Sequence, residues 1–470
     1  MGNPKAFLTI NRKEAGYRPV HDRVNDFGEV EQTLNTSDRM KQASRCMDCG
    51  VPFCHWACPL GNKQPEWQHL VYMGKWKEAY QVLESTCDFP EFTGRICPAP
   101  CEKSCVLKLS ADEPVTIREN EVSIAERAFL EGYIKVHHPE RNGKKVAVIG
   151  SGPAGLTAAN RLNRKGYLVT VFEKNEMAGG LLRYGIPNFK LAKNIVERRI
   201  DLMREEGVVF KTGMQIDKLP DGFDAYCIAI GAEVPRDLPI EGRNLKGIHF
   251  AMDYLSQQNR LLEGIEVAPG KIINAKGKKV LVIGGGDTGS DCVGTANRQK
   301  ASKVTQIEIL EKPPVGYNPA TPWPTMYPQV LKTSSSHEEG CERRWSLTSC
   351  RFIGEKGILK GVEVEEVTWE TGEDGRMQMQ LTGKKEIIEA DLVFLAMGFV
   401  HPVQEGLIKS SKLTIDNRKN ITIDKSFKSS VSNVFACGDA TTGASLVVKA
   451  MAAGRDTAKA IDSYLSSITL

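Results

Sequence analysis

The same order of apolar and polar segments occurs at two places in the chain. The first, KVAVIGSGPAGLTAANRLNRKGYLVTVFEK, covers residues 145–174, and the second, KKVLVIGGGDTGSDCVGTANRQKASKVTQIEIL, covers residues 278–310. Each begins with an apolar run that predicts a buried strand, continues through a glycine-rich turn and an amphipathic segment, and ends in a second apolar run. The order predicts two strand–turn–helix–strand units, which makes this an α/β protein with two Rossmann-like nucleotide-binding domains.

The N-terminal part of the chain has a different pattern. Residues 66–86, EWQHLVYMGKWKEAYQVLEST, carry apolar side chains near one helical face at Trp67, Leu70, Val71, Tyr80 and Leu83. Loops rich in Cys, Pro and Gly surround this stretch. We therefore expect a helical N-terminal domain that folds around metal.

These patterns predict a domain order. We expect a helical domain at 1–140, a first Rossmann-like domain in two parts at 141–250 and 399–470, and a second one at 251–398 inserted in the first. After the second unit, the alternating stretches GVEVEEVTWE, GRMQMQL and ADLVFLAMG predict a small antiparallel meander.

Composition and charge exclude some classes of function. The 470 residues are 41% hydrophobic and 26% charged, with a net charge of +4 and no Lys/Arg block, so we expect no nucleic-acid partner. No apolar run approaches the roughly 20 residues that span a bilayer. The N-terminal segment lacks the apolar core of a secretory signal. We expect a cytoplasmic protein whose cysteines stay reduced.

Seven cysteines in the first quarter of the chain carry the strongest chemical signal. They are Cys46, Cys49, Cys54, Cys58, Cys97, Cys101 and Cys105. The first four, with Pro59 after the last, approach the bacterial ferredoxin spacing, in which three thiolates hold one cluster and the fourth reaches the neighbouring one. This spacing predicts two [4Fe–4S] clusters. Structural zinc sites and a disulfide framework are the alternatives, because they use the same residues.

The ligands divide into two sets. We assign Cys46, Cys49, Cys54 and Cys105 to one cluster, and Cys58, Cys97 and Cys101 to the other. The second set is one thiolate short of four, so a carboxylate is expected to complete it. Glu121 is the first candidate and Glu119 the second. The other cysteines, Cys87 among them, are expected to be packing residues. Cys437 is also expected to be a small buried residue, and an electronic effect on a nearby cofactor is the alternative.

The first glycine-rich turn predicts an FAD site. Its residues are Gly150, Gly152, Pro153, Ala154 and Gly155. Such a turn lets the backbone approach a pyrophosphate at a helix N-terminus, and Glu173 at the end of the next strand would accept the ribose hydroxyls. Further along, we assign Gly180, Leu181, Gly438 and Asp439 to the same site, because a second glycine turn with an acid could bind the ribityl chain of a flavin.

The second glycine-rich turn predicts the site for a nicotinamide nucleotide. Its residues are Gly284, Gly286, Asp287, Thr288 and Gly289. The following strand ends in Glu308-Ile309-Leu310-Glu311, and Glu311 there favours the free 2′-hydroxyl of NADH. Arg298, Lys303 and Lys312 could instead meet the 2′-phosphate of NADPH. The balance favours NADH. Hydride transfer between these cofactors depends on how they are placed and needs no set of acid–base or nucleophilic side chains. We therefore assign no catalytic side chain.

Over nearly its full length the sequence resembles the small (β) subunits of glutamate synthase. The motifs that carry the resemblance include RCMDCGVPFCHWACPL, FPEFTGRICPAPCEKSC, AGGLLRYGIPNFKL and VFACGDATTGASLVV. The resemblance implies a subunit that oxidises NAD(P)H at FAD and passes electrons through two [4Fe–4S] clusters to a large (α) subunit. That subunit carries FMN and a [3Fe–4S] cluster and makes glutamate from glutamine and 2-oxoglutarate. In the similar module of dihydropyrimidine dehydrogenase, a side chain other than cysteine completes one cluster.

Three other readings remain. The main alternative is the flavin subunit of another NAD(P)H:acceptor oxidoreductase, such as a ferredoxin:NADP transhydrogenase. A disulfide reductase would need a Cys-x-x-Cys near the flavin, whereas the pair Cys46 and Cys49 lies inside the cluster run. An accessory scaffold without catalysis would not need two intact nucleotide turns.

The sequence departs from the family pattern at one place. Family members that use NADPH tend to carry an arginine pair where this chain reads Leu310-Glu311-Lys312.

Overall fold

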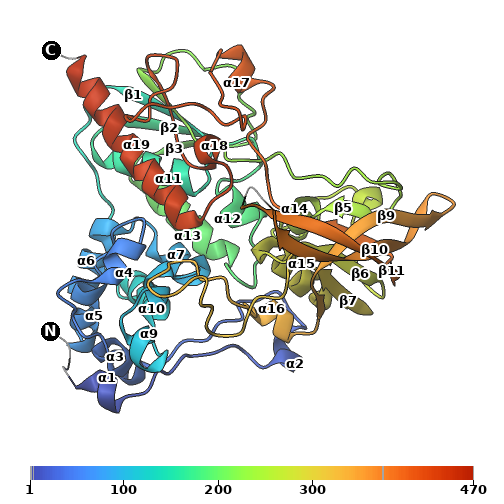
Figure 1. Ribbon diagram of the computed structural model, residues 1–470. Helices are drawn as coiled ribbons and strands as arrows, with labels where there is room; N and C mark the ends of the chain where they lie inside the picture. The colour runs from blue at the N-terminus through green and yellow to red at the C-terminus, as the bar shows by residue number, and fades with distance from the viewer. Residues whose placement is uncertain (1–2, 4, 373–374, 469–470) are drawn as a thin grey trace.

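The computed structural model describes residues 3, 5–372 and 375–468. Its chain forms a helical N-terminal region and two parallel sheets, and a third, antiparallel sheet extends from the second of these (Figure 1). None of the helices among the described residues combines the length and the apolar character needed to cross a membrane.

The N-terminal region is helical, as the pattern predicts. Its helices are α1 (Ala6–Thr9), α2 (Val20–Arg23), α3 (Thr36–Ser44), α4 (Phe53–Ala57), α5 (Gln64–Tyr72), α6 (Trp76–Thr86), α7 (Pro90–Ile96), α8 (Pro100–Lys103), α9 (Leu107–Ala111) and α10 (Ile117–Leu130). The stretch at residues 66–86 divides into α5 and α6, because Gly74 between them has φ +71°, which ends a helix readily. Trp67, Val71 and Leu83 are fully buried.

The first parallel sheet has the strand order β13-β4-β1-β2-β3. Its strands are β1 (Lys145–Ile149), β2 (Leu168–Phe172), β3 (Val209–Lys211), β4 (Ala225–Ile228) and β13 (Val434–Ala436). The helices associated with it are α11 (Pro153–Arg164), α12 (Leu181–Tyr184), α13 (Lys193–Glu205), α17 (Leu407–Ser410), α18 (Asp439–Thr442) and α19 (Val447–Ser467). The long helix α19 lies against α11 (Figure 1).

The second parallel sheet has the strand order β5-β12-β6-β7-β8. Its strands are β5 (Ile248–Phe250), β6 (Lys279–Ile283), β7 (Lys303–Ile307), β8 (Glu342–Arg344) and β12 (Leu392–Leu395), and its helices are α14 (Ala251–Leu262), the 3-10 turn η1 (Pro269–Lys271), α15 (Asp287–Arg298) and α16 (Ser335–Glu338). All these strands fall between β4 and β13 in the chain. The prediction that one Rossmann-like domain is inserted in the other is therefore confirmed.

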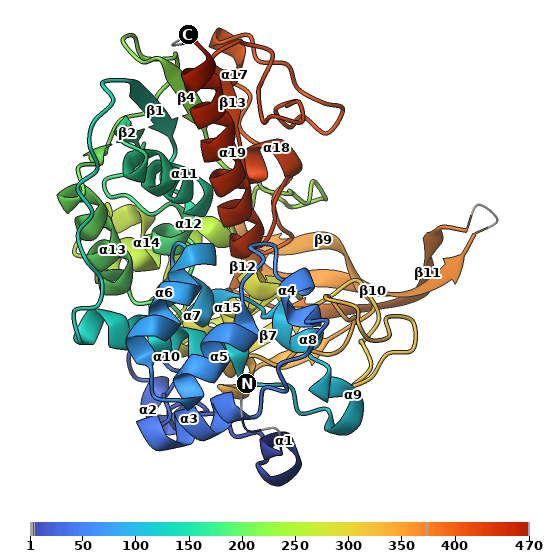
Figure 2. The ribbon, with the colours of Figure 1, turned by 90° about the vertical axis from the view of Figure 1, so that its left-hand side faces the viewer.

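The antiparallel sheet was predicted only in part. It consists of β9 (Leu347–Glu355), β10 (Ile358–Thr371) and β11 (Met377–Glu389), and the β10–β11 hairpin extends away from the rest of the molecule (Figure 2). The stretch ADLVFLAMG does not belong to it, because β12 pairs in parallel with β5 and β6. All four residues of β12 are buried, as expected for a strand covered on both faces.

The helical region and the first sheet share one buried apolar core, which includes Trp67 and Phe92 from the former and Val148 and Leu162 from the latter. A buried ion pair reinforces this contact. Arg199 of α13 reaches Glu91 of α7, with Nε 2.5 Å from Oε1 and Nη2 3.1 Å from Oε2. Their side chains are only 2% and 0% exposed. The pair ties the N-terminal helices to the first nucleotide-binding domain.

We expect the substitution Glu91→Gln to lower the free energy of unfolding by about 3–5 kcal/mol, because it leaves the Arg199 charge buried without its partner. The control Glu405→Gln removes an exposed pair with Lys409, whose side chains are 77% and 73% exposed. Its expected cost is at most about 1 kcal/mol. Urea unfolding followed by tryptophan fluorescence measures both. Equal losses in the two variants would show that the interface does not depend on the buried pair.

Candidate iron–sulfur and nucleotide sites

Cys46, Cys49, Cys54 and Cys105 border one cavity in the helical region. Cys46 follows α3, Cys54 lies in α4, and Cys105 follows α8. The rest of the lining is mostly apolar, and burial raises the pKa of Cys46 to about 12. Across the described residues, no three His, Cys, Asp or Glu side chains are spaced to hold a single metal ion. A coordinating metal centre removes the proton from a thiol, so four soft donors around an apolar cavity fit an iron–sulfur cluster.

Cys58, Cys97 and Cys101 form a second set with Glu121. Cys58 ends α4, Cys97 ends α7, Cys101 lies in α8, and Glu121 lies in α10. Burial is the main cause that raises the pKa values of these three cysteines, and the charge of Glu121 adds to it in each case. For Cys97 and Cys101, neighbouring thiols of the set also raise the pKa. For Cys97 the pKa rises to about 12. The four thiols of the first set thus share one cavity, and the charge of Glu121 acts on each thiol of the second set. That these residues are the cluster ligands stays a prediction.

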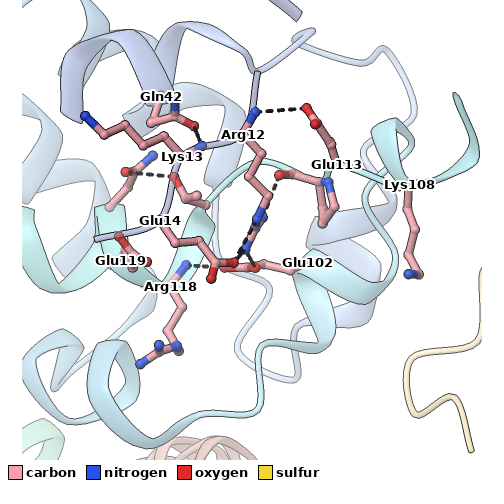
Figure 3. Close-up of polar contacts among 12 residues, drawn as sticks. Arg12, Lys13, Glu14, Gln42, Glu102, Lys108, Glu113, Arg118 and Glu119 are labelled. Atoms are coloured by element: carbon pink, nitrogen blue, oxygen red, sulfur yellow. Dashed lines mark hydrogen bonds and ion pairs between the residues drawn. The ribbon is translucent and has the colours of Figure 1, made fainter. Parts of the chain in front are cut away.

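Glu119 and Glu121 face different surroundings. Glu119 accepts a hydrogen bond from Arg39 at 2.9 Å, next to the N-terminal segment shown in Figure 3. Glu121 is 7% exposed and accepts hydrogen bonds from Thr93 and, at 3.4 Å, from Asn62. Burial raises its pKa to about 7. Of the two candidates, the structure brings only Glu121 to the second set of thiols.

Cys87 is a residue whose position the sequence did not reveal. It is fully buried, and its Sγ lies 3.3 Å from Thr93 Oγ1 and 4.0 Å from Glu121 Oε1. It therefore belongs to the immediate surroundings of the second set. Its place at the end of α6, ten residues before Cys97, gives no spacing signal that would have shown this.

A network of polar contacts holds α8, the helix that carries Cys101 (Figure 3). Glu102, the next residue, accepts hydrogen bonds from Arg12 Nη2 at 2.8 Å and from the backbone N–H of Arg118 at 2.8 Å. Arg12 also donates its backbone N–H to Glu113 at 2.9 Å. The N-terminal segment, α8 and α10 are thus fixed to one another, which fixes Cys101 relative to Glu121.

The first glycine-rich turn connects β1 to α11. A Cβ on Gly155 would lie 2.0 Å from the backbone oxygen of Gly150, so only glycine allows this close approach of helix and strand. A Cβ on Gly152 would have no neighbour within 4 Å. Gly152 is the N-cap of α11, so the turn presents open backbone at a helix N-terminus, which suits a phosphate group.

Glu173 follows directly after β2 and is 5% exposed. Its Oε2 accepts the backbone N–H of Ser151 at 3.2 Å, and its Oε1 accepts that of Asn175 at 2.8 Å. The carboxylate is therefore held beside the glycine-rich turn, where the sequence placed it.

A cavity of about 930 Å³ opens in front of this turn. Its lining contains most of the residues that the sequence assigned to FAD, namely Gly150, Gly152, Pro153, Ala154, Glu173, Gly180, Leu181 and Asp439. Gly155 and Gly438 are not among its lining residues. The volume is within the usual range for a cofactor site.

The C-terminal part of the chain closes one side of the cavity. Asp439 begins α18 and accepts a hydrogen bond from Ser445 at 2.6 Å, and burial raises its pKa. The helix α19 begins at Val447, which also lines the cavity. Cys437 lines the cavity too, with its Sγ 3.8 Å from that of Cys227.

The second glycine-rich turn repeats this geometry between β6 and α15. A Cβ on Gly289 would lie 2.3 Å from the backbone oxygen of Gly284, and a Cβ on Gly286 would meet nothing within 4 Å. Glu308 follows directly after β7 and accepts the backbone N–H of Gly285 at 2.6 Å. It therefore occupies the position that Glu173 has at the first turn. Asp287 and Thr288 begin the helix α15.

Two residues assigned to this second site are not the ones that the structure brings to the glycine-rich turn. Glu311 is exposed and lies three residues beyond Glu308, so Glu308 takes the position given to Glu311. Arg298 lies at the far end of α15, where it is buried over the ring of Phe189 at 3.7 Å and pairs with Glu339. A helix of 12 residues is about 18 Å long. Arg298 is therefore committed to packing, away from the nucleotide turn.

Comparison with known proteins agrees with this arrangement. Residues 23–133 match the family described as dihydropyrimidine dehydrogenase domain II, 4Fe-4S cluster, and residues 144–321 and 340–454 match the pyridine nucleotide-disulphide oxidoreductase family. The solved structure of FprA from Mycobacterium tuberculosis in complex with NADPH has a TM-score of 0.54 and 17% identity, covering 69% of this chain and 85% of that one. This likeness shows a shared fold.

The full-length relatives are more specific. The glutamate synthase (NADPH) small chain of Mycobacterium tuberculosis is 46% identical, over 99% of this chain and 96% of that protein. The corresponding small chain of Bacillus subtilis is 41% identical over 99% of both chains. The glutamate synthase (NADH) of Schizosaccharomyces pombe is 42% identical over 97% of this chain, which matches 22% of that longer protein. The chain therefore belongs to the glutamate synthase small-chain family of NAD(P)H-dependent oxidoreductases.

Proposed function

We propose that the chain is the electron-input subunit of a cytoplasmic glutamate synthase. It takes electrons from NAD(P)H at FAD and passes them through two [4Fe–4S] clusters to a large subunit that carries FMN and a [3Fe–4S] cluster and makes glutamate. The observation that carries the proposal is that one chain packs the helical region with both sets of thiols against the domain with the FAD-type cavity. Co-purification with a large subunit and NAD(P)H-dependent formation of glutamate from glutamine and 2-oxoglutarate test it.

In the large cavity, the turn at Gly150–Gly155 would hold the pyrophosphate of FAD and Glu173 its adenosine ribose. Asp439 would accept hydrogen bonds from hydroxyl groups of the ribityl chain. When bound, FAD accepts a hydride from NAD(P)H and releases electrons one at a time, which iron–sulfur clusters can carry. The second turn would hold the nicotinamide nucleotide, with Glu308 in place of Glu311 at its ribose.

The helix α19 connects the second set of thiols with the cavity. Burial raises the pKa of Cys58 and the charge of Arg455 on α19 opposes this rise, while the Arg455 guanidinium donates to the backbone oxygens of Leu60 at 3.0 Å and Thr86 at 2.9 Å. The same helix lines the cavity with its first turn. We therefore place the cluster of Cys58, Cys97, Cys101 and Glu121 next to the flavin.

The first set lies on the outward side. The lining of its cavity comes only from residues between Cys46 and Ile117, within the helical region. Val51 and Trp56, close to Cys49 and Cys54 in the chain, are 72% and 63% exposed. Exposed apolar side chains beside a redox centre suit a protein partner. We therefore assign the transfer to the large subunit to the cluster of Cys46, Cys49, Cys54 and Cys105.

Replacing Cys97 with Ser is expected to separate electron input from electron output. Flavin reduction by NAD(P)H should keep its wild-type rate, while glutamate formation with the large subunit should fall at least about 100-fold, because a ligand of the inner cluster is lost. Stopped-flow absorbance measures the first step and a coupled assay the second. Cys350→Ser, on β9, is the matched control and should change neither. Unchanged coupled turnover in the Cys97 variant would contradict the assignment.

The two glutamates of α10 allow a direct test of the eighth ligand. Glu121→Ala should lower the iron content and change the electron paramagnetic resonance spectrum of one cluster, because it removes the oxygen donor beside the three thiols. Glu119→Ala should leave iron content and spectrum unchanged, because that carboxylate binds Arg39. Identical spectra for the Glu121 variant and the wild type would exclude Glu121 as a ligand.

At the second turn, Glu308→Ala should raise KM for the nucleotide about tenfold, the equivalent of about 1.4 kcal/mol, because both the ribose contact and the bond to Gly285 are lost. Glu311→Ala should leave KM within about twofold, since this exposed side chain has no such bond. Initial-rate kinetics with ferricyanide as acceptor measure both. The reverse order of effects would restore Glu311 to the ribose position.

A further inference from the structure

Two cations lie beside one tryptophan at the edge of the second nucleotide site. The guanidinium carbon of Arg343 is 5.0 Å from the ring centre of Trp345, and Nζ of Lys312 is 5.2 Å from it. Within the described part of the chain, neither cation lies within 4.0 Å of a carboxylate oxygen. Cations without a carboxylate partner beside a nucleotide site are available to an anionic group of the ligand.

The register of the sheet turns Arg343 toward the nucleotide turn. Arg343 on β8 stands opposite Gln306 on β7 in a parallel pair, so the two side chains share one face of the sheet. The Gln306 side chain is on the face of the sheet that carries the glycine-rich turn, because its amide donates to the backbone oxygen of Gly284 at 2.8 Å. Glu308, two residues after Gln306, reaches the same turn. Arg343 is therefore on the face where the nucleotide would lie.

The neighbouring Arg344 points to the other face. It pairs with Glu386 of β11, with Nη1 3.0 Å from Oε2. The two adjacent arginines thus have different environments, and only Arg343 is directed to the nucleotide site. Lys312 approaches from the loop after β7, and a hydrogen bond of 3.1 Å from Trp369 to the backbone oxygen of Ile309 holds this loop.

We propose that Arg343 and Lys312 bind the 2′-phosphate of NADPH. The inference rests on the proposed function and makes it more specific, because it identifies the nucleotide. In a Rossmann-like site the adenosine ribose lies at the acid after the second strand, and a 2′-phosphate extends beyond it. In this chain Glu308 is that acid, and Arg343, Trp345 and Lys312 lie on its outer side, along the same edge of the sheet.

The charge of Glu308 does not oppose such a ligand strongly. Its Oε2 accepts the backbone N–H of Gly285 at 2.6 Å, and its Oε1 accepts that of Ile309 at 2.9 Å. Hydrogen bonds from backbone N–H groups stabilise the ionised carboxylate and offset part of its field. Glu308 can then bind the ribose 3′-hydroxyl while the two cations bind the phosphate. NADPH recognition thus does not require the arginine pair that this chain lacks at Leu310-Glu311-Lys312.

Calorimetric titration of the complete, cofactor-loaded protein tests the inference without turnover. The probes are adenosine 2′,5′-bisphosphate, which carries the 2′-phosphate, and 5′-AMP, which lacks it. We expect the wild type to bind the bisphosphate at least about tenfold more tightly. Arg343→Gln should remove most of this preference and leave the affinity for 5′-AMP unchanged. Lys312→Ala should remove a smaller part, because its side chain is exposed.

Arg344→Gln is the matched control and should keep the full preference for the bisphosphate. Equal binding of both probes by the wild type, or an unchanged preference in the Arg343 variant, would overturn the inference. Parallel loss of affinity for both probes in that variant would also overturn it, because this would indicate a general structural role. Failure of the wild type to bind either probe would instead remove the nucleotide role of the second turn. The two failures are therefore distinguishable.

Discussion

The contact between α19 and the helical region is the constraint on which the electron path depends. Arg455 of α19 donates hydrogen bonds to the backbone oxygen of Leu60, two residues after Cys58, and to that of Thr86. Electrons pass between protein-bound centres efficiently only over short gaps. A separate iron–sulfur domain on a flexible linker would not guarantee such a gap. Here the shared apolar core and the buried Glu91–Arg199 pair make the two regions one packed unit.

The two nucleotide turns show how one local geometry can serve two ligands. In both, a glycine allows the helix to approach the first strand, and a glutamate after the second strand accepts a backbone N–H of the turn. They differ in what surrounds them. The first turn faces a large cavity that the C-terminal segment closes, which suits a resident cofactor. The residues of the second turn are more exposed, which suits a nucleotide that binds and leaves.

The local parts of this structure could be predicted from the sequence, and the non-local parts could not. The glycine turns and the acid at Glu173 follow from short-range spacing, and the family and the inserted domain were predicted correctly. The division of the thiols joins distant cysteines, such as Cys46 with Cys105, and as an assignment of cluster ligands it stays a prediction. The choice of Glu311 over Glu308 depended on where β7 ends, and strand ends are the least certain feature of a sequence. The stretch at β12 was assigned to the meander because alternation alone does not reveal a parallel partner. The positions of Cys87 and Arg343 depend on contacts with distant segments, which no spacing reveals.

The central claim is that flavin and both clusters form one electron path inside this chain. Anaerobic stopped-flow absorbance with NADPH and NADH, on protein whose iron and flavin have been quantified, tests it most directly. The account predicts about eight irons and one FAD per chain, with flavin reduction by the nucleotide followed by a decrease of the broad iron–sulfur absorbance. Flavin reduction without any iron–sulfur change, or zinc in place of iron, would contradict it.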